Sequence, residues 1–347
     1  MRIVLDGVIY GRNPNGGITR YWTEVLAAIS RMNVSIRLDL ILPKGVARPA
    51  GLPCLTAGSL SASLAVARAD IFHTSYYSHW PRMNGPSVVT VYDYIDASFP
   101  LLRPNEGGFV DHQLYAIRGA SVVITISQSS RELTLKLAGI DPSRIFVAYP
   151  AVAFPFSLPP PCAEEIKEFR RVHTGGAPYL VHVGSRKNYK NFWTLLRAFG
   201  LAAQNTDRHL LILGGGHSLT TEELDFIISA RLLDRVHFYP AVDDATLRQA
   251  YAGADAIIHA SLMEGFGIPV IEALACGTGL ILSDIPVYRE IAGGRASFVE
   301  ATDIEAWGHA MKSEVFVHPS WREEVLRQYT WEAAAQVHLS AYKSILP

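Results

Sequence analysis

Short apolar segments alternate with longer segments of helical periodicity along most of the chain. Residues 2–6 and 122–127 are mostly apolar over their whole length, which is typical of parallel strands buried on both faces. Residues 19–30 instead place apolar side chains three or four positions apart, as a helix with one buried face does. This alternation predicts an α/β protein built on parallel sheets.

The most informative stretch is residues 261–277. An apolar strand is predicted at 256–260, a loop with Gly265 and Gly267 follows, and a helix is expected to begin at Pro269 and to stop at Gly277. Residues 280–282 predict the next parallel strand. In such a unit the helix N-terminus presents unpaired N–H groups at the carboxyl end of the strand, which suits a phosphate.

Two carboxylates flank this loop. Glu264 lies on the loop, and Glu272 is expected in the first turn of the helix, so both can face the same crevice. An ionised carboxylate only accepts hydrogen bonds, and a ribose offers two adjacent hydroxyl donors. The residues alone fit equally well a Glu272 that complements the helix dipole and a Glu264 that is solvated.

Residues 264–273, Glu-Gly-Phe-Gly-Ile-Pro-Val-Ile-Glu-Ala, resemble the glutamate, seven residues, glutamate signature of the retaining glycosyltransferases of family 4. The resemblance implies the GT-B fold of the group 1 glycosyltransferases, with two Rossmann-like parallel-sheet domains and an active site in the cleft between them. It implies that Glu272 holds the nucleotide ribose. The residues that would hold the donor sugar and its diphosphate are Glu264, Gly265, Phe266, Gly267 and Ile268.

The composition changes at residues 149–161, which contain five prolines and are therefore expected to be irregular and stiff. We predict an N-terminal Rossmann-like acceptor domain over 1–150 and a proline-rich linker over 151–177. A C-terminal Rossmann-like nucleotide-sugar domain is predicted over 178–325. The helix within 326–347 resembles the family's last helix, which crosses back to the N-terminal domain.

In the second domain, Gly184 ends a predicted strand, and Arg186 and Lys190 follow it at the carboxyl end. Two cations there can neutralise a diphosphate and stabilise the charge that grows on a leaving nucleotide. The family carries an arginine and a lysine after the same glycine, whereas the residues alone also fit a solvated basic loop. By the same resemblance, the backbone near Val242 passes the nucleotide base.

In the first domain, Gly16 and Gly17 precede the helix at 19–30. By resemblance they close over the donor phosphates and the acceptor, although a loop that merely caps a helix would also explain them. Asp93 follows the predicted strand 88–91 and is expected to face the ligand, next to Tyr92, where many family members have a histidine. His73 and His79 could line the acceptor side, but a structural role is favoured.

The charge and the cysteine content indicate which partners and which cellular compartment to expect. The formal net charge is -1, but the first 150 residues carry a balance of +4. This balance is compatible with an anionic lipid headgroup or a diphosphate acceptor, and equally with a chance scatter of surface charge. The sequence has no dense Lys/Arg run, which favours the chance scatter, and no nucleic acid is expected as a partner. Cys54, Cys162 and Cys276 are far apart, which indicates reduced thiols and a cytoplasmic protein.

No apolar stretch approaches the roughly 20 residues that span a bilayer, so any membrane contact is expected to be peripheral, at the inner face of the cytoplasmic membrane through the N-terminal domain. No Asp-x-Asp motif occurs, and neither a metal nor another cofactor is expected. The resemblance implies that the nucleotide sugar is a substrate.

The expected function is therefore a retaining, metal-independent transfer of a sugar from a nucleotide-diphosphate donor to a saccharide acceptor that is lipid-linked. By likeness to mannosyltransferases of bacterial surface polysaccharide and O-antigen synthesis, a donor of the GDP-mannose type is favoured, with a UDP-sugar as the alternative. The residues expected to act in catalysis are Arg186, Lys190, Glu264 and Asp93. A nicotinamide-binding protein, a GT-B epimerase or phosphorylase, and a non-catalytic sugar-nucleotide-binding scaffold remain the competing classes.

Overall fold

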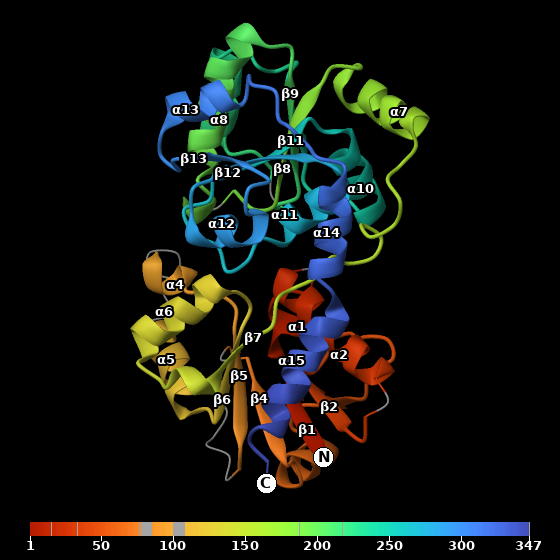
Figure 1. Cartoon of the computed structure of the whole chain (residues 1–347), viewed down its shortest axis with the longest axis vertical. Helices are drawn as coiled ribbons and strands as arrows, with labels where there is room; N and C mark the ends of the chain where they lie inside the picture. The colour runs from red at the N-terminus through yellow and green to blue at the C-terminus, as the bar shows by residue number, and fades with distance from the viewer. Residues whose placement is uncertain are drawn as a thin grey trace. The chain divides into compact units, whose positions relative to one another are not determined.

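The computed structural model describes residues 1–14, 16–32, 34–75, 77, 85–99, 108–186, 188–216 and 218–346. The backbone contacts divide the chain into two compact units. The first combines Met1–Ala151 with Tyr329–Pro347, and the second is Val152–Gln328. Each unit contains a parallel sheet with helices packed on it (Figure 1).

The first unit holds a seven-stranded parallel sheet in the order β3-β2-β1-β4-β5-β6-β7. Its strands are β1 (Arg2–Asp6), β2 (Arg37–Leu42), β3 (Cys54–Thr56), β4 (Ile71–Thr74), β5 (Ser87–Val91), β6 (Val122–Thr125) and β7 (Ile145–Val147). Its helices are α1 (Val8–Arg12), α2 (Gly17–Arg31), α3 (Leu60–Ala67), α4 (Ile95–Ser98), α5 (Phe109–Gly119), α6 (Gln128–Ala138), the short η2 (Pro142–Arg144) and α15 (Trp331–Lys343). The strand order reverses between β1 and β4, as in Rossmann-like sheets.

Helix α15 comes from the end of the chain and packs against α2 in this first unit (Figure 1). Buried polar pairs fix it in place. The Tyr21 hydroxyl lies 2.8 Å from Nε2 of His338, and Nδ1 of His73 lies 2.8 Å from the hydroxyl of Tyr342. Unpaired, these groups would each cost free energy on burial, so the pairs specify one orientation of α15 on the sheet.

His73 is fully buried, and its other ring nitrogen lies 2.8 Å from the Thr90 hydroxyl. Both nitrogens are thus engaged inside the sheet core, which agrees with the structural role favoured for this residue. His79 lies outside the residues that the structure describes.

The second unit holds a six-stranded parallel sheet in the order β10-β9-β8-β11-β12-β13. Its strands are β8 (Tyr179–Val183), β9 (His209–Leu213), β10 (Val236–Tyr239), β11 (Ala256–His259), β12 (Gly279–Ser283) and β13 (Ser297–Val299). Its helices are α7 (Ala163–Thr174), η3 (Asn188–Lys190), α8 (Phe192–Ala202), η4 (Ala203–Asn205), α9 (Thr221–Ser229), α10 (Asp244–Gly253), α11 (Ile268–Ala275), α12 (Pro286–Ala292), α13 (Ile304–Ala310) and α14 (Ser320–Gln328). The strand order reverses between β8 and β11.

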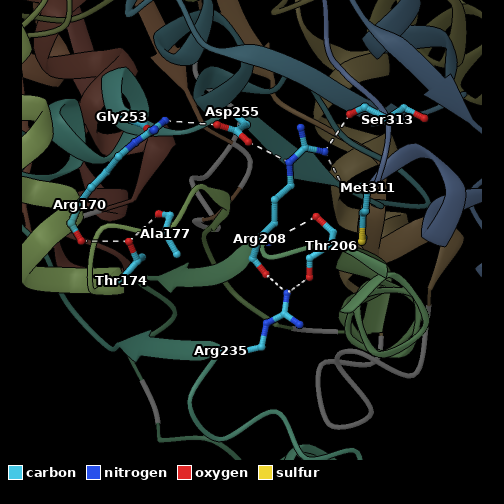
Figure 2. Close-up of polar contacts among 10 residues, drawn as sticks. All are labelled: Arg170, Thr174, Ala177, Thr206, Arg208, Arg235, Gly253, Asp255, Met311 and Ser313. Carbon is cyan, nitrogen blue, oxygen red and sulfur yellow. Dashed lines mark hydrogen bonds and ion pairs between the residues drawn. The ribbon is translucent and has the colours of Figure 1, made fainter. Parts of the chain in front are cut away.

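Three arginines form hydrogen bonds at the amino-terminal ends of the strands of this second sheet (Figure 2). Arg208 donates to a carboxylate oxygen of Asp255 at 2.8 Å and to the carbonyls of Met311 and Ser313. Arg170 donates to Asp255 from the other side, and Arg235 donates to backbone carbonyls that include that of Arg208 (Figure 2). These guanidinium groups donate to backbone carbonyls in the connecting loops, and they thereby stabilise the sheet at the amino-terminal ends of its strands.

Two predicted boundaries need correction. The segment predicted as a linker over 151–177 contains the twelve-residue helix α7, which begins behind a capping box formed by Cys162 and Glu165. The prolines lie before this helix, so they do not prevent it. The chain also enters the first unit at Tyr329 rather than at 326, because α14 ends the second unit at Gln328.

In the described part of the chain, no helix combines the length and the apolar character that crossing a membrane requires.

Candidate functional site

The carboxyl ends of β8 and β11 carry the candidate site. These strands are neighbours at the point where the strand order of the second sheet reverses, which is where open parallel sheets bind ligands. The loop after β8 supplies Gly184, Arg186 and Lys190, and the loop after β11 supplies Glu264 to Gly267. A backbone hydrogen bond of 2.8 Å from Leu262 to the carbonyl of Tyr189 ties the two loops together.

Gly267 allows the second loop to turn into α11. Its φ of +114° favours glycine, and a Cβ there would lie 2.9 Å from a ring carbon of Tyr288. The helix begins at Ile268, one residue earlier than predicted, with Pro269 in its first turn. It ends at Ala275, with Cys276 as its C-cap, and Gly277 follows with a φ of +78°. The predicted strand, glycine loop and short helix are therefore present.

Glu264 forms a mostly buried ion pair with Lys190. The Lys190 Nζ lies 2.6 Å from Oε1 of Glu264, and the two side chains are only 13% and 10% exposed. The Ser261 hydroxyl donates to the same oxygen at 2.7 Å. Among the residues that the structure describes, the second oxygen of Glu264, Oε2, has no hydrogen-bond partner. The bonds of the carboxylate are thus concentrated on one oxygen.

Tyr288 and His259 lie behind this pair. The Tyr288 hydroxyl is 3.4 Å from Oε1 of Glu264 and 3.4 Å from the Ser261 hydroxyl, and Nδ1 of His259 lies 3.3 Å from the Tyr288 hydroxyl. Burial raises the pKa of Tyr288 well above its ordinary value, so the phenol remains a donor. Burial, followed by the nearby His182 and Lys190, holds the pKa of His259 well below 6.5, so the imidazole is neutral.

Arg186 and Lys190, the two predicted phosphate ligands, have different partners. The Nε of Arg186 donates to both carboxylate oxygens of Glu223, at 3.0 and 3.1 Å, and another guanidinium nitrogen donates to the carbonyl of Ser218. The guanidinium also lies 4.6 Å from the ring centroid of Phe238. Lys190 alone of the two cations pairs with Glu264.

Glu272 is 2% exposed and lies in the second turn of α11, because the helix begins at Ile268. The expected position in the first turn is therefore wrong, and the ribose contact stays a prediction. Burial, with a smaller contribution from the charge of Glu272, raises the pKa of Cys276 to about 12. This thiol is therefore protonated and unreactive at neutral pH. Val242, near the expected base site, is half-buried in the loop after β10.

In the first unit, Gly16 is the N-cap of α2 and Gly17 is its first residue. The backbone N–H of Gly16 donates to the carbonyl of Asn13 at 3.1 Å, and a Cβ on Gly16 would collide with the Asn13 amide. A side chain at this position would therefore require the Asn13 side chain to move. The predicted contact with phosphates stays a prediction.

Asp93 also belongs to the first unit, at the start of α4. Its Oδ1 accepts from the backbone N–H of Ile95 at 3.0 Å, and its carbonyl accepts from Gln113 at 2.9 Å. Tyr92, in the position where many family members have a histidine, is 2% exposed and packs edge-on against Tyr21. Its burial favours a packing role over a contact with the transferred sugar.

Ser261, Tyr288 and His259 were not predicted as site residues. Ser261 opens the loop, and a hydroxyl three residues before Glu264 was a usable local signal. Tyr288 comes from α12, after the next strand of the sheet, so nothing in its local sequence indicates the contact. Within the described ranges, no group of three or more His, Cys, Asp or Glu side chains is arranged to hold a metal ion.

Comparison with known proteins adds three findings. Residues 164–324 match the family model for glycosyl transferases group 1. The O-antigen chain mannosyltransferase B of Escherichia coli is 24% identical over 288 residues, which cover 78% of this chain and 75% of that protein. The O-antigen chain mannosyltransferase RfbU of Salmonella typhimurium is 26% identical over 198 residues, 57% of this chain and 52% of that protein.

Solved structures show the same fold. The sucrose-phosphate synthase of Thermosynechococcus elongatus superimposes with a TM-score of 0.75 at 19% identity and covers 99% of this chain and 98% of its own. Anabaena HepE, solved with UDP and glucose, superimposes with a TM-score of 0.74 at 18% identity and covers 100% of both chains.

Proposed function

Because the chain is a group 1 glycosyltransferase with the GT-B fold, we propose that it transfers mannose from GDP-mannose to a saccharide acceptor. The predicted fold class and enzyme class are confirmed, and the donor and acceptor are our inference. The observation that carries the proposal is the Lys190–Glu264 pair, in which Oε2 of Glu264 has no partner among the described residues. A carboxylate held on one oxygen and open on the other is suited to a sugar hydroxyl.

The choice of mannose is supported by two relatives that are named O-antigen mannosyltransferases. We therefore place the reaction in the assembly of O-antigen or a related bacterial surface polysaccharide, on a lipid-linked saccharide. The positive balance of the first 150 residues favours an anionic acceptor and peripheral contact with the inner face of the cytoplasmic membrane.

Each site residue has a distinct proposed role. Lys190 and the N-terminus of α11 neutralise the diphosphate and the charge that develops on the leaving nucleotide. Glu264 accepts from hydroxyls of the transferred sugar, and Glu272 accepts from the ribose. Arg186, which pairs with Glu223, contributes positive charge to the same site.

The proposed chemistry is metal-independent and retaining. The glycosidic C–O bond to the phosphate breaks, and the acceptor hydroxyl bonds to the same carbon on the same face. Its proton passes to an oxygen of the departing phosphate, so the protein supplies no covalent nucleophile. In the first unit, Gly16 and Gly17 are proposed to close over donor and acceptor, and Asp93 is proposed to orient the acceptor.

Calorimetry of the full chain with GDP, UDP, ADP and NAD, all in EDTA, tests the donor half. We expect GDP to bind most tightly without metal. Tighter binding of UDP would indicate a UDP-sugar as the donor. This alternative is supported by the likeness to HepE, which was solved with UDP and glucose. Failure of all the nucleoside diphosphates to bind would refute the donor proposal.

Turnover of GDP-mannose with membrane extracts containing lipid-linked saccharides tests the rest. Binding without turnover would favour a non-catalytic scaffold. A mannose trapped covalently on Glu264 or Asp93 would refute the mechanism in which the phosphate guides the acceptor.

A further inference from the structure

Three hydrogen-bond donors converge on one oxygen of Glu264. Lys190 Nζ lies at 2.6 Å, the Ser261 hydroxyl at 2.7 Å and the Tyr288 hydroxyl at 3.4 Å from Oε1. Oε2 receives none of these bonds within the described part of the chain. This unequal arrangement fixes the rotation of the carboxylate and leaves a defined oxygen for another donor.

One order of the protons behind Glu264 satisfies all of these contacts at once. In this order the Ser261 hydroxyl donates to Oε1, and the Tyr288 hydroxyl donates to Oε1 or to the Ser261 oxygen. The phenol oxygen is then an acceptor for Nδ1–H of His259, at 3.3 Å. The other ring nitrogen of His259, Nε2, is buried without a hydrogen-bond partner, as expected for the neutral form protonated on Nδ1.

The ring of Tyr288 supports the same loop by packing. Tyr288 is fully buried, and its ring fills the space in which a Cβ of Gly267 would stand. One side chain thus contacts both the carboxylate and the backbone turn that leads into α11. Displacing it would change the direction of Glu264 and the start of the helix together.

We propose that Tyr288, oriented by His259, is a positioning residue that turns Oε2 of Glu264 toward a hydroxyl of the donor sugar. Its hydroxyl and that of Ser261 hold Oε1, so the carboxylate is set before the donor binds. Preorganisation of this kind reduces the cost of ordering the site at the moment of reaction. The inference rests on the proposed function, because it needs a nucleotide sugar as the ligand.

Tyr288→Phe tests the hydroxyl while keeping the ring that packs on Gly267. GDP lacks the sugar, so its affinity should change by less than about twofold, whereas affinity for GDP-mannose should fall about 5- to 20-fold. The value of kcat should fall by about tenfold, with KM for the acceptor unchanged. Tyr179→Phe is the matched control, because it removes another buried hydroxyl of the second unit, one that donates to the carbonyl of Ala250 at 2.8 Å.

The role of His259 is tested by a pair of variants. His259→Asn keeps a donor close to the position of Nδ1 and should retain most of the preference for GDP-mannose over GDP. His259→Leu removes the donor at similar volume and should lower that preference as Tyr288→Phe does. The melting temperature of every variant separates a loss of positioning from a loss of stability. The Tyr179→Phe control should have a lowered melting temperature but normal affinity for the sugar nucleotide.

The outcomes are distinguishable from failure of the proposed function. A wild-type chain that binds neither GDP nor GDP-mannose, and neither UDP nor UDP-glucose, would overturn both proposals. A wild-type chain that prefers the sugar nucleotide, with a Tyr288→Phe variant of equal preference and equal kcat, would overturn only the positioning role. Equal losses in the His259→Asn and His259→Leu variants would remove His259 from the arrangement.

Discussion

Lys190→Ala is the substitution that tests the proposed phosphate role most directly. Its Nζ lies 2.6 Å from Oε1 of Glu264, and its side chain is 13% exposed, so its charge is little screened by water. A charge-assisted contact with phosphate contributes about 1.5–3 kcal/mol, so we expect GDP to bind about 10- to 150-fold more weakly. Guanosine, which has no phosphate, should lose less than about twofold. Turnover should fall further, because the charge on the leaving group grows in the transition state.

Calorimetry with GDP and guanosine gives this comparison, and Lys167→Ala is the control because Lys167 is an exposed cation of the same unit on α7. The substitution also leaves the carboxylate of Glu264 without its cation, which should cost about 2–3 kcal/mol in the free energy of unfolding measured in urea. Glu264→Gln should recover part of that loss in the double variant. Equal weakening of GDP and guanosine would contradict the phosphate role even if the unfolding result held.

Three further predictions follow from the burial and geometry of named residues. Glu272→Ala should weaken GDP by about 1–3 kcal/mol, and in calorimetry the variant should no longer distinguish GDP from its 2′,3′-dideoxy analogue. Gly267→Ala should lower the free energy of unfolding by about 2–4 kcal/mol, because the new Cβ meets the Tyr288 ring at a left-handed φ; an unchanged urea midpoint would contradict this. Burial lowers the pKa of His182 to about 4 and that of His338 to about 3, so the stability gained from keeping them neutral is complete above about pH 6.5. It should be lost as the pH falls from there toward these values, by about 1.4 kcal/mol per pH unit for each histidine, and His338→Gln should reduce the slope of the unfolding free energy against pH.

The parts of the fold that the sequence predicted best are those governed by local chemistry. The apolar run before Ser261, the glycines of the loop and Pro269 together indicate a strand, a turn and a helix start without any knowledge of distant residues. The structure has this order, with Gly267 at a φ of +114°. Local signals also existed for α7, which has acidic residues in its first turn and Gly175 at a φ of +64° after its end. The prolines that precede α7 led us to predict a linker over residues that form this helix.

The pairing of side chains within the site could not be predicted in the same way. Arg186 and Lys190 are four residues apart and were assigned to the same phosphate, but Arg186 binds Glu223 and Lys190 binds Glu264. The partners are 37 and 74 residues away along the chain, so each pairing depends on how separate strands and helices pack. The sequence predicted that two cations lie at the end of a strand, but it did not predict which carboxylate each of them binds.

The backbone explains why the two cations separate. After β8 the chain forms the short helix η3, and the carbonyl of Tyr189 accepts from the N–H of Leu262 in the loop after β11. This bond brings Lys190 beside Glu264, while Arg186, before η3, remains close to α9, where Glu223 completes the capping box with Thr220. Glu223 therefore orders the start of α9 and holds Arg186 at once, so Glu223→Gln should release the guanidinium and weaken the helix cap. Tighter GDP binding by the Glu223→Gln variant in calorimetry would mean that the ion pair with Glu223 keeps Arg186 from binding phosphate. Weaker GDP binding would mean that Glu223 orients Arg186 for the phosphate.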